Sequence, residues 1–338
     1  MKILIIGPSW VGDMVMSQSL YITLKKQHPE AIIDVLAPTW CKPILARMPQ
    51  VNEAIEMPIG HKSFNLKERW RIGRRLKQSQ YTHAYIQPNS AKSALIPFFA
   101  GIKNRIGWKG EMRYGLLTDL RPDKKIFQYW VERHVALAYD KDAMQEKVSL
   151  ENCPTPRLTI DVHHQQQLML KLGLSEQRPI IGMCPGAEFG PSKRWPEQYY
   201  AQVAQYLIDH GKQVWLFGSK KDNATTSKIT HSLTAEQQKH CHNLAGKTQL
   251  VEVVDLLAAC DSVICNDSGL MHVSCAVGCH VIAIYGSTSP EYTPPMTDKA
   301  QIASIDLSCR PCFKRECPLG HLNCLKQLSP KMIIDLLK

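Results

Sequence analysis

The stretch SVICNDSGLMH, from Ser262 to His272, is the part of the sequence that points most clearly to the fold. It begins with an apolar run typical of a buried strand, passes through a polar turn and continues into a helix. This order leaves backbone N–H groups unpaired at the start of the helix, where a phosphate can bind. Asp267 and Ser268 suit the capping position, and Gly269 lets a ligand approach the backbone closely. An ordinary capped loop of an α/β protein has the same pattern, so the interpretation depends on the rest of the chain.

Apolar runs that end in a turn recur along the whole chain. In the first half they are KILIIG, AIIDVLAP, EAIEMP and THAYIQP, and in the second half IIGMCPG, QVWLFGS and VIAIYGST. Such runs, alternating with helical segments, predict the α/β class, with parallel sheets and right-handed crossovers. A chain of 338 residues is long enough for two such Rossmann-like domains of about 150 residues each.

A shift in composition divides the two domains, because residues 150–179 are rich in proline and glutamine. The final PKMIIDLLK predicts a helix beginning near Ser329. We therefore expect an N-terminal domain, a linker, a second domain and a C-terminal helix, at residues 1–155, 156–178, 179–325 and 326–338. The simplest architecture has the carboxyl edges of the two sheets facing each other across a cleft.

The positive charge is concentrated in the first half of the chain. The net charge is +11, and residues 1–150 contain 23 Lys and Arg against 13 Asp and Glu, whereas the remainder is almost neutral. This asymmetry predicts an anionic partner for the first domain: nucleic acid, an acidic membrane surface or a phosphorylated glycan. No nucleic-acid-binding motif is present, which disfavours the first of these. A basic surface that serves only solubility is the remaining alternative.

The sequence also bears on the cellular compartment. It has no run of about 20 apolar residues, and KILIIG follows the first methionine without a signal peptide. Eight of the twelve cysteines are scattered through apolar segments, as expected of reduced thiols in a cytosolic protein. We therefore expect a cytoplasmic protein.

The other four cysteines, Cys309, Cys312, Cys317 and Cys324, cluster in CRPCFKRECPLGHLNC together with His321. Two thiols separated by two residues and followed by further thiols are compatible with a tetrahedral structural zinc site. Free thiols or a disulfide are the alternative, and the sequence leaves both open.

The first glycine-rich turn, GPSWVGDM, has the spacing of a phosphate-binding loop but not its chemistry. Gly7 and Gly12 are correctly separated for a Walker A loop, yet Asp13 stands where that loop has a lysine. A carboxylate repels phosphate, which argues against nucleotide binding at this turn. Asp13 instead lies at the carboxyl edge of the first strand, where α/β enzymes place catalytic groups. Helix capping is the structural alternative for this residue.

A basic segment, FNLKERWRIGRRLK, lies within residues 61–77. Leu66, Trp70 and Leu76 have roughly helical spacing, so a helix is predicted. Such a helix could rest on an anionic membrane surface or contact an acidic substrate. A solvated helix with one packed face is the commoner arrangement for this pattern.

Four turns of the second domain bring cations to the places where its strands end. These turns are PGAEFGPSKRWP, FGSKKD, NLAGKTQ and NDSGLMH. Lys193, Lys220 and Lys247 are among the cations of the first three turns, and the fourth is the helix start described above. Free N–H groups and a few cations suit a diphosphate, and we expect Lys193 to be its main partner.

Several of these segments, taken in order, resemble one family. MKILIIGPSWVGDMVMSQSL, PNSAKSALIPFFAGI, GWKGEMRYGLL, PGAEFGPSKRWP, LFGS and NDSGLMH are similar to the ADP-heptose:lipopolysaccharide heptosyltransferases, glycosyltransferase family 9. The resemblance implies a GT-B fold with an acceptor-binding first domain and a nucleotide-sugar-binding second domain. It also implies inversion at the anomeric carbon without a catalytic metal or cofactor, and a terminal helix that crosses back to the first domain.

The resemblance assigns roles to individual residues. Asp13 corresponds to the general base that deprotonates the acceptor hydroxyl, and Lys193 to the lysine that neutralises the departing diphosphate. Asp222 falls where the family has an acidic residue near the nucleotide ribose. The motif around the sugar and phosphates of the donor corresponds to Asp267, Ser268, Gly269 and His272. The further substrate-binding positions are Gly186, Ser192, Gly218, Ser219, Gly246, Lys247, Asn89 and Lys92.

The reaction that the resemblance implies is heptose transfer from ADP-heptose to heptosyl-Kdo2-lipid A. It implies that the enzyme works at the cytosolic face of the inner membrane, in contact with the anionic surface. The segment NSAKSALIPFFAGI favours this second heptose transfer over the first and the third. Transfer to another acceptor hydroxyl stays open, as does a nucleotide-sugar-binding module without catalysis. The carboxylate of Asp13 argues against the module, because binding alone has no use for it.

Overall fold

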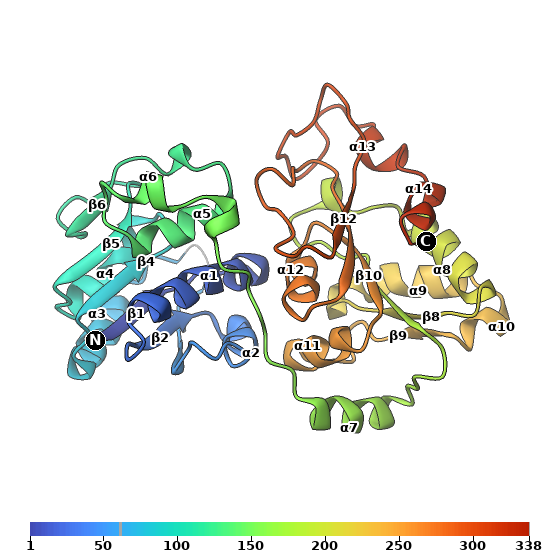
Figure 1. Ribbon diagram of the computed structural model, residues 1–338, viewed down its shortest axis with the longest axis horizontal. Helices are drawn as coiled ribbons and strands as arrows, with labels where there is room; N and C mark the ends of the chain where they lie inside the picture. The colour runs from blue at the N-terminus through green and yellow to red at the C-terminus, as the bar shows by residue number, and fades with distance from the viewer. Residues whose placement is uncertain (61–62, 338) are drawn as a thin grey trace. The chain divides into compact units, whose positions relative to one another are not determined.

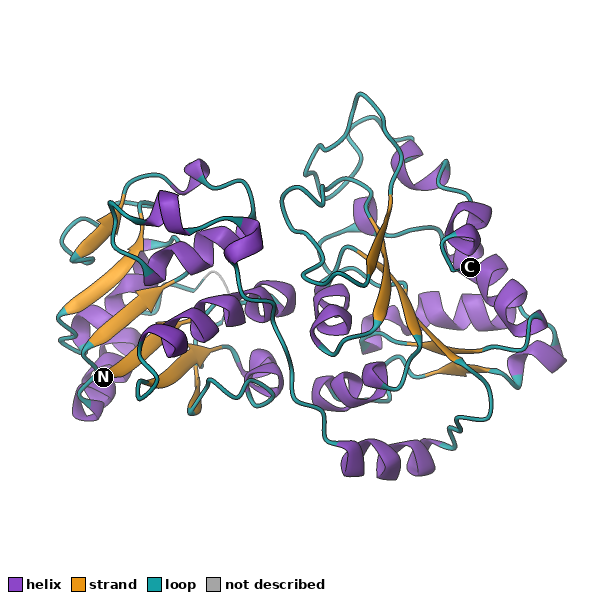
Figure 2. Cartoon of the chain, viewed as in Figure 1, coloured by secondary structure: helices purple, strands orange, loops and turns teal. Residues whose placement is uncertain are grey.

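The computed structural model describes residues 1–60 and 63–337, and the chain divides into two compact units, Met1–Pro156 and Arg157–Lys338 (Figure 1). Each unit contains a parallel β-sheet flanked by helices (Figure 2). The predicted α/β class is confirmed, and each unit is a Rossmann-like domain in its strand order.

The sheet of the first unit has, within the described residues, six parallel strands in the order β3-β2-β1-β4-β5-β6. The strands are β1 (Lys2–Ile6), β2 (Ile32–Ala37), β3 (Glu53–Glu56), β4 (His83–Ile86), β5 (Asn104–Trp108) and β6 (Asp119–Arg121). β1 lies between β2 and β4, and its Ile6 is paired with Ile86 of β4. The strand order reverses between β1 and β4, and open α/β sheets bind ligands beyond the carboxyl ends of strands at such a switch point.

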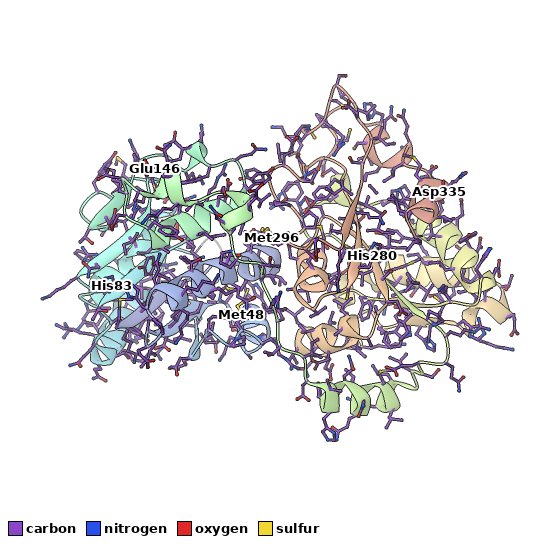
Figure 3. All side chains as sticks on the ribbon, in the orientation of Figure 1. Met48, His83, Glu146, His280, Met296 and Asp335 are labelled. Atoms are coloured by element: carbon purple, nitrogen blue, oxygen red, sulfur yellow. The ribbon has the colours of Figure 1, made fainter. Side chains whose placement is uncertain are left out.

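Helices cover both faces of this sheet. They are α1 (Val11–Gln27), α2 (Lys42–Leu45), α3 (Leu66–Leu76), α4 (Ala91–Phe99), α5 (Trp130–Val135) and α6 (Met144–Lys147). α1 packs against α5, and α3 packs against α4. Leu4 and Ile6 join the apolar cluster that contains Ile72 of α3, and Ile3 and Ile5 are also fully buried. Side chains therefore fill the layers on both faces of β1, as its unbroken apolar sequence predicts (Figure 3).

The second unit repeats this strand order. Its described strands form a parallel sheet of six in the order β12-β11-β10-β7-β8-β9. They are β7 (Ile180–Cys184), β8 (Gln213–Leu216), β9 (Cys241–Asn243), β10 (Ser262–Asn266), β11 (His280–Ile284) and β12 (Ala300–Ala303). The switch point here lies between β7 and β10, where Cys265 is paired with Cys184.

The helices of the second unit lie along the same two faces. They are α7 (Val162–Leu172), α8 (Glu197–Asp209), α9 (Asn223–His231), α10 (Ala235–Gln238), α11 (Leu250–Ala258), α12 (Gly269–Ala276), α13 (Asn323–Lys326) and α14 (Pro330–Asp335). α8 packs against α9 and α14, whereas α11 packs against α7 and α12. Among the described residues of both units, no helix has the length and apolarity needed to cross a membrane.

The segment predicted as a linker, 156–178, contains helix α7, so this prediction is corrected. Asp161 caps the helix by accepting a hydrogen bond from the His164 N–H at 2.9 Å. His164 Nδ1 lies 2.8 Å from Oδ2 of Asp255 on α11, and Gln165 Nε2 donates to the Asp255 carbonyl at 2.6 Å. The proline- and glutamine-rich composition hid a capped helix that belongs to the second unit.

The C-terminal segment forms the helix α14, as predicted. Ser329 is the N-cap of α14, as expected, but the helix belongs to the second unit and packs against α8. Ile333 is fully buried in the same apolar cluster as Tyr200 of α8. The described residues of 326–338 therefore pack within the second unit, and a return of this helix to the first domain stays a prediction. Lys338 lies outside the described residues.

Candidate active site

The turns that follow β7 and β10 carry an ion pair at the switch point of the second sheet. Lys193 ends a short 3-10 helix, Pro191–Lys193, and its Nζ lies 2.6 Å from Oδ2 of Asp267. Thr288 Oγ1 donates a hydrogen bond of 2.6 Å to the same oxygen. The Asp267 side chain is only 3% exposed and the Lys193 side chain 14%. Two residues that the sequence placed separately in a diphosphate site are thus in direct contact.

Helix α12 begins directly after Asp267. Ser268 occupies the N-cap position in an extended conformation, and its side chain makes no capping hydrogen bond to the described residues. The first N–H groups of the helix, starting with Gly269, therefore receive no hydrogen bond acceptor from that side chain. Together with the positive end of the helix dipole and the Lys193 ammonium, these groups suit a phosphate oxygen.

His272, one turn into α12, is a buried and neutral histidine. It is 5% exposed, and its Nδ1 has no hydrogen-bond partner in the part of the chain that is described. Burial lowers its pKa to about 4; the Asp267 carboxylate opposes this shift and the Lys193 ammonium adds to it. At neutral pH the imidazole is uncharged, and its buried Nδ1 keeps hydrogen-bonding capacity for a ligand.

The turn after β8 is built around Asp222. Its Oδ2 accepts hydrogen bonds from the Ser219 N–H at 2.8 Å and the Ser219 hydroxyl at 2.7 Å. A Cβ atom at Gly186 would lie 2.5 Å from Oδ1 of Asp222, and one at Gly218 would lie 2.8 Å from its Cβ. The absence of side chains at these two glycines leaves room for the carboxylate. Asp222 therefore holds its own turn in place.

The remaining predicted residues of the second unit lie in turns around this centre. Gly246 has φ +72°, and a Cβ atom there would lie 3.0 Å from the Cα of Lys220; its N–H donates to the Gly218 carbonyl at 3.0 Å. Lys247 is exposed. Ser192 is buried, and its Oγ lies 2.9 Å from the Ser287 hydroxyl. The adjacent carboxyl ends of β10, β7, β8 and β9 bring these turns to one edge of the sheet.

Asn266 is a structural residue of this site that the sequence analysis missed. It is fully buried, and its Oδ1 accepts hydrogen bonds from the Trp195 N–H at 3.1 Å and the Tyr200 hydroxyl at 3.2 Å. Its Nδ2 donates to the Pro185 carbonyl at 2.7 Å. One amide therefore ties the turn that carries Lys193 to the end of β10. The available signal was a polar residue at the end of an otherwise apolar strand.

In the first unit, Asp13 lies inside helix α1 instead of in the turn before it. The helix begins at Val11, with Trp10 as its N-cap, so it starts within the segment that the sequence analysis interpreted as a turn. The position in the first turn places the carboxylate near the positive end of the helix dipole. The Cys41 thiol is close by, since its pKa is raised to about 12 by burial and by the charge of Asp13.

A second group of polar side chains lies after β4, and the sequence analysis identified only Asn89 of it. Gln87 Nε2 lies 3.1 Å from Nδ1 of His134 on α5, and both side chains are buried. Gln87 Oε1, Asn89 Oδ1 and His134 Nε2 have no hydrogen-bond partner among the described residues. Burial lowers the pKa of His134 to about 3, so this imidazole is also neutral.

This group adjoins the switch point of the first sheet. The Gln87 N–H donates to the carbonyl of Ile6, the last residue of β1, at 3.2 Å. α5, which carries His134, packs against α1, which carries Asp13. Lys92, predicted with Asn89, instead directs its ammonium to the Ser63 carbonyl at 3.3 Å.

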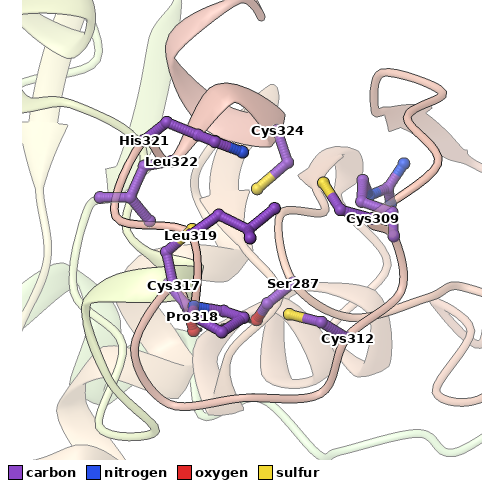
Figure 4. A pocket seen from close by; sticks show the side chains of 11 residues that line it. Ser287, Cys309, Cys312, Cys317, Pro318, Leu319, His321, Leu322 and Cys324 are labelled. Carbon is purple, nitrogen blue, oxygen red and sulfur yellow. Dashed lines mark hydrogen bonds between the residues drawn. The ribbon is translucent and has the colours of Figure 1, made fainter.

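The cysteine cluster lies in the second unit beside Ser192. Cys309, Cys312, Cys317 and Cys324 line one cavity of about 20 Å³ together with His321, Ser192 and Ser287 (Figure 4). A cavity of this size holds a water molecule or a single ion but no nucleotide. Backbone N–H groups of Leu322 and residues 319–321 lower the pKa of the Cys317 thiol. Among the described residues, no three His, Cys, Asp or Glu side chains already stand in the arrangement of a metal site.

The comparisons with known proteins agree with this geometry. The model of glycosyltransferase family 9 (heptosyltransferase) matches residues 69–323. Lipopolysaccharide heptosyltransferase 2 of Escherichia coli K12 is 50% identical over 99% of this chain and 97% of its own length. The solved structure of E. coli ADP-heptose lps heptosyltransferase II is 48% identical, with a TM-score of 0.86 over 98% of this chain and 100% of that one. Lipopolysaccharide heptosyltransferase 1 of Pseudomonas aeruginosa is 25% identical over only 37% of this chain.

The two Rossmann-like units, together with the match to a solved heptosyltransferase structure, identify a glycosyltransferase of the GT-B fold. Within that class, the chain belongs to glycosyltransferase family 9, the heptosyltransferases. The family predicted from the order of the sequence segments is thereby confirmed.

The buried His272 predicts a loss of stability in acid. Its pKa is about 4 in the folded protein against 6.5 for an unperturbed imidazole. Between these values the unfolded chain binds more protons than the folded one, so the free energy of unfolding decreases as the pH falls. The effect reaches roughly 3 kcal/mol at the lower end of this range.

Urea denaturation measures the free energy of unfolding at neutral pH and at a pH near 4, the pKa of His272 in the folded protein. This free energy should fall less between the two pH values in His272→Gln than in the parent protein. His134 keeps its own contribution in this variant. His231→Gln, at an exposed position of α9, is the matched control and should retain the full pH dependence. An unchanged pH dependence in His272→Gln contradicts the assignment.

Proposed function

We propose that this chain transfers L-glycero-D-manno-heptose from ADP-heptose to the first heptose of the lipopolysaccharide inner core, with inversion at the anomeric carbon. The acceptor is heptosyl-Kdo2-lipid A. The observation that carries the proposal is the contact between Lys193 and Asp267 at the start of α12, an arrangement suited to a diphosphate. It occurs in a chain that is 50% identical along nearly its whole length to a lipopolysaccharide heptosyltransferase 2.

Transfer of the first or the third heptose is the alternative within the same family. It is less well supported, because the match to a heptosyltransferase 1 covers 37% of the chain whereas the match to a heptosyltransferase 2 covers 99%. A nucleotide-sugar-binding module without catalysis is a further alternative. Such a module would have no role for the carboxylate of Asp13, which lies in the first turn of α1 in the first unit.

The decisive experiment incubates the protein with ADP-heptose and defined Kdo2-lipid A acceptors that carry either no heptose or one. Transfer only to the acceptor with one heptose supports the proposal. Transfer to the acceptor without heptose identifies the first transfer instead, and no transfer to either contradicts both.

The second unit binds the donor and stabilises the leaving group. As the bond between the anomeric carbon and the phosphate oxygen breaks, negative charge grows on the diphosphate of ADP. Lys193 and the N–H groups at the start of α12 stabilise this charge, because they are fixed in place before the reaction begins. Asp267 holds the lysine in position, and the diphosphate takes over part of that role when the donor binds. The neutral His272 offers a hydrogen bond to the donor without repelling or attracting its charge.

The first unit supplies the base. Asp13 accepts the proton of the acceptor hydroxyl while the acceptor oxygen attacks the anomeric carbon. Its place in the first turn of α1 puts the carboxylate near the positive end of the helix dipole, where negative charge is stabilised. General base catalysis of this kind contributes roughly 10²–10⁴ in rate.

The polar side chains that lie after β4, Gln87, Asn89 and His134, bind the acceptor. A sugar hydroxyl donates one hydrogen bond and accepts others, so it matches the unsatisfied Gln87 Oε1 and His134 Nε2. Both groups are neutral, which suits a hydroxyl better than a phosphate. Trp10 and Trp40 are 45% and 52% exposed beside the turn that leads to Asp13, and they offer apolar faces to a sugar ring.

Helix α3 contacts the anionic inner-membrane surface, which places the reaction at the cytosolic face where the lipid acceptor is embedded. Leu66 and Trp70 are 47% and 51% exposed, although both are apolar. The exposed cations of the same segment are Lys67, Arg71, Arg74, Arg75 and Lys77. An exposed apolar stripe bordered by cations is the composition of helices that lie in a lipid headgroup region.

Replacement of the proposed base gives the first prediction for this function. Asp13→Ala and Asp13→Asn should lower kcat about 10²- to 10⁴-fold and leave the Kd for ADP unchanged, because ADP binds to the second unit. Turnover with a defined acceptor and calorimetric ADP titration measure the two quantities. Glu30→Gln, an exposed carboxylate just beyond the other end of α1, is the control. A parental kcat in both Asp13 variants rules out the base assignment.

Replacement of His134 tests the acceptor site. His134→Phe keeps a ring of similar size but removes both nitrogens, so KM for the acceptor should rise roughly 2- to 10-fold, the effect of one lost hydrogen bond. KM for ADP-heptose should not change. His83→Phe is the matched control, since His83 lies at the start of β4 (Figure 3), whereas the proposed acceptor site follows the end of this strand. If KM for ADP-heptose rises instead, or if His83→Phe has the same effect as His134→Phe, the assignment of the acceptor site is wrong.

Vesicle binding tests the membrane contact. The protein should sediment with vesicles that contain phosphatidylglycerol, much less with pure phosphatidylcholine, and less again at high salt. Arg74→Ser combined with Arg75→Ser should weaken binding by roughly tenfold or more, since each cation contributes about 1 kcal/mol near an anionic surface. Leu170→Ser removes an exposed apolar residue of α7 and should have no effect. Equal binding to both kinds of vesicle contradicts this contact.

A further inference from the structure

The chain between β12 and α13, residues 304–322, supports the turn that carries Lys193. No helix or strand is assigned to this described segment. The Ser192 N–H donates to the Arg315 carbonyl at 3.2 Å, and the Ser192 hydroxyl donates to the Lys314 carbonyl. The Phe313 N–H donates to the Ser287 carbonyl at 2.8 Å. The position of Lys193 therefore depends on a long irregular segment that needs its own source of rigidity.

The four clustered cysteines are the side chains able to supply it. They line a single cavity of about 20 Å³, and Figure 4 shows Cys309, Cys312 and Cys324 pointing their sulfur atoms into it. The other eight cysteines are each buried, whereas three of these four are only partly buried. The cavity is large enough for one ion and too small for a substrate.

The segment that carries the four cysteines is positively charged. Arg310, Lys314 and Arg315 lie between or beside the cysteines, against the single carboxylate of Glu316. This excess of positive charge offsets the net negative charge that one divalent metal ion and four thiolates carry together. His321 is not needed as a ligand, because its Nδ1 accepts a hydrogen bond from the Asn323 N–H at 2.9 Å.

We propose that Cys309, Cys312, Cys317 and Cys324 bind one Zn²⁺ ion as four thiolates, and that this ion fixes the segment on which the Lys193 turn rests. The four thiol protons pass to solvent on binding, and no oxidation or reduction takes place. In the structure the thiols face a common cavity without converging on one point. Each cysteine has a single side-chain torsion with three staggered positions, through which its sulfur atom can reorient within the cavity. The ion has a structural role, and the transfer reaction does not pass through it.

Metal analysis of the purified full-length protein tests the site. Elemental analysis should find about one zinc ion per chain, the stoichiometry of a four-thiolate site. Cys309→Ser combined with Cys312→Ser should lose it, whereas Cys153→Ser, a buried cysteine of the first unit, should retain it. Where the double variant fails to fold, chelator-treated parent protein is titrated with Zn²⁺ alone, and tight binding of one equivalent supports the site. The proposed site is overturned if all twelve thiols can be titrated and the protein takes up no zinc. It is also overturned if mass spectrometry finds a disulfide within the cluster.

The supporting role is tested separately. Removal of zinc should weaken ADP binding roughly three- to tenfold, because Lys193 is less well held and one charged hydrogen bond is partly lost. If the protein binds zinc but its removal leaves the Kd for ADP unchanged, the link between the ion and Lys193 is overturned. This part of the inference rests on the proposed donor site, but the zinc content does not. A protein that contains zinc and transfers no heptose would contradict the proposed function alone.

Discussion

The contact between Lys193 and Asp267 is the interaction on which the second unit depends. Removing two charges from water is costly, and their attraction offsets this only when the geometry is good and the remaining hydrogen bonds are made. Thr288 supplies one of these bonds, and the start of α12 lies directly after the carboxylate. The pair joins the ends of β7 and β10, so the sheet, the helix dipole and the cation all meet at one point. In the proposed donor site, a diphosphate would therefore meet a lysine that is already positioned.

The same burial accounts for the neighbouring groups. The surroundings that bury Asp267 also bury His272, and loss of hydration keeps that imidazole neutral. Asn266 fixes the distance between the two turns through three hydrogen bonds. Ser192 continues the support outward to the cysteine-containing segment. The first unit has a comparable arrangement at its own switch point, where Gln87 and His134 are buried with unsatisfied hydrogen-bonding atoms.

The sequence predicted the parts of the site whose chemistry is local. Strand, turn and helix follow one another within a dozen residues, so NDSGLMH and GPSWVGDM could be interpreted without knowledge of the fold. Gln87 and His134 are 47 residues apart, and no local pattern connects them. Asp222 was correctly placed in its turn, but only coordinates show that its carboxylate caps that turn and fills the space beside Gly186. The helix within 156–178 was missed because its apolar contacts are few and its hydrogen bonds go to Asp255, far away in the chain.

By itself, the sequence determined the α/β class, the two-domain organisation, the family, and the residues that end each strand. These follow from short-range periodicity, from turn chemistry and from segments that occur in a fixed order. Only the tertiary structure decided which turns meet, because the order of strands in a sheet is set by packing between elements far apart in the chain. It made β7 and β10 neighbours, and so it paired Lys193 with Asp267 across 74 residues of sequence. The free energy of that pairing depends on burial, which no single stretch of sequence specifies.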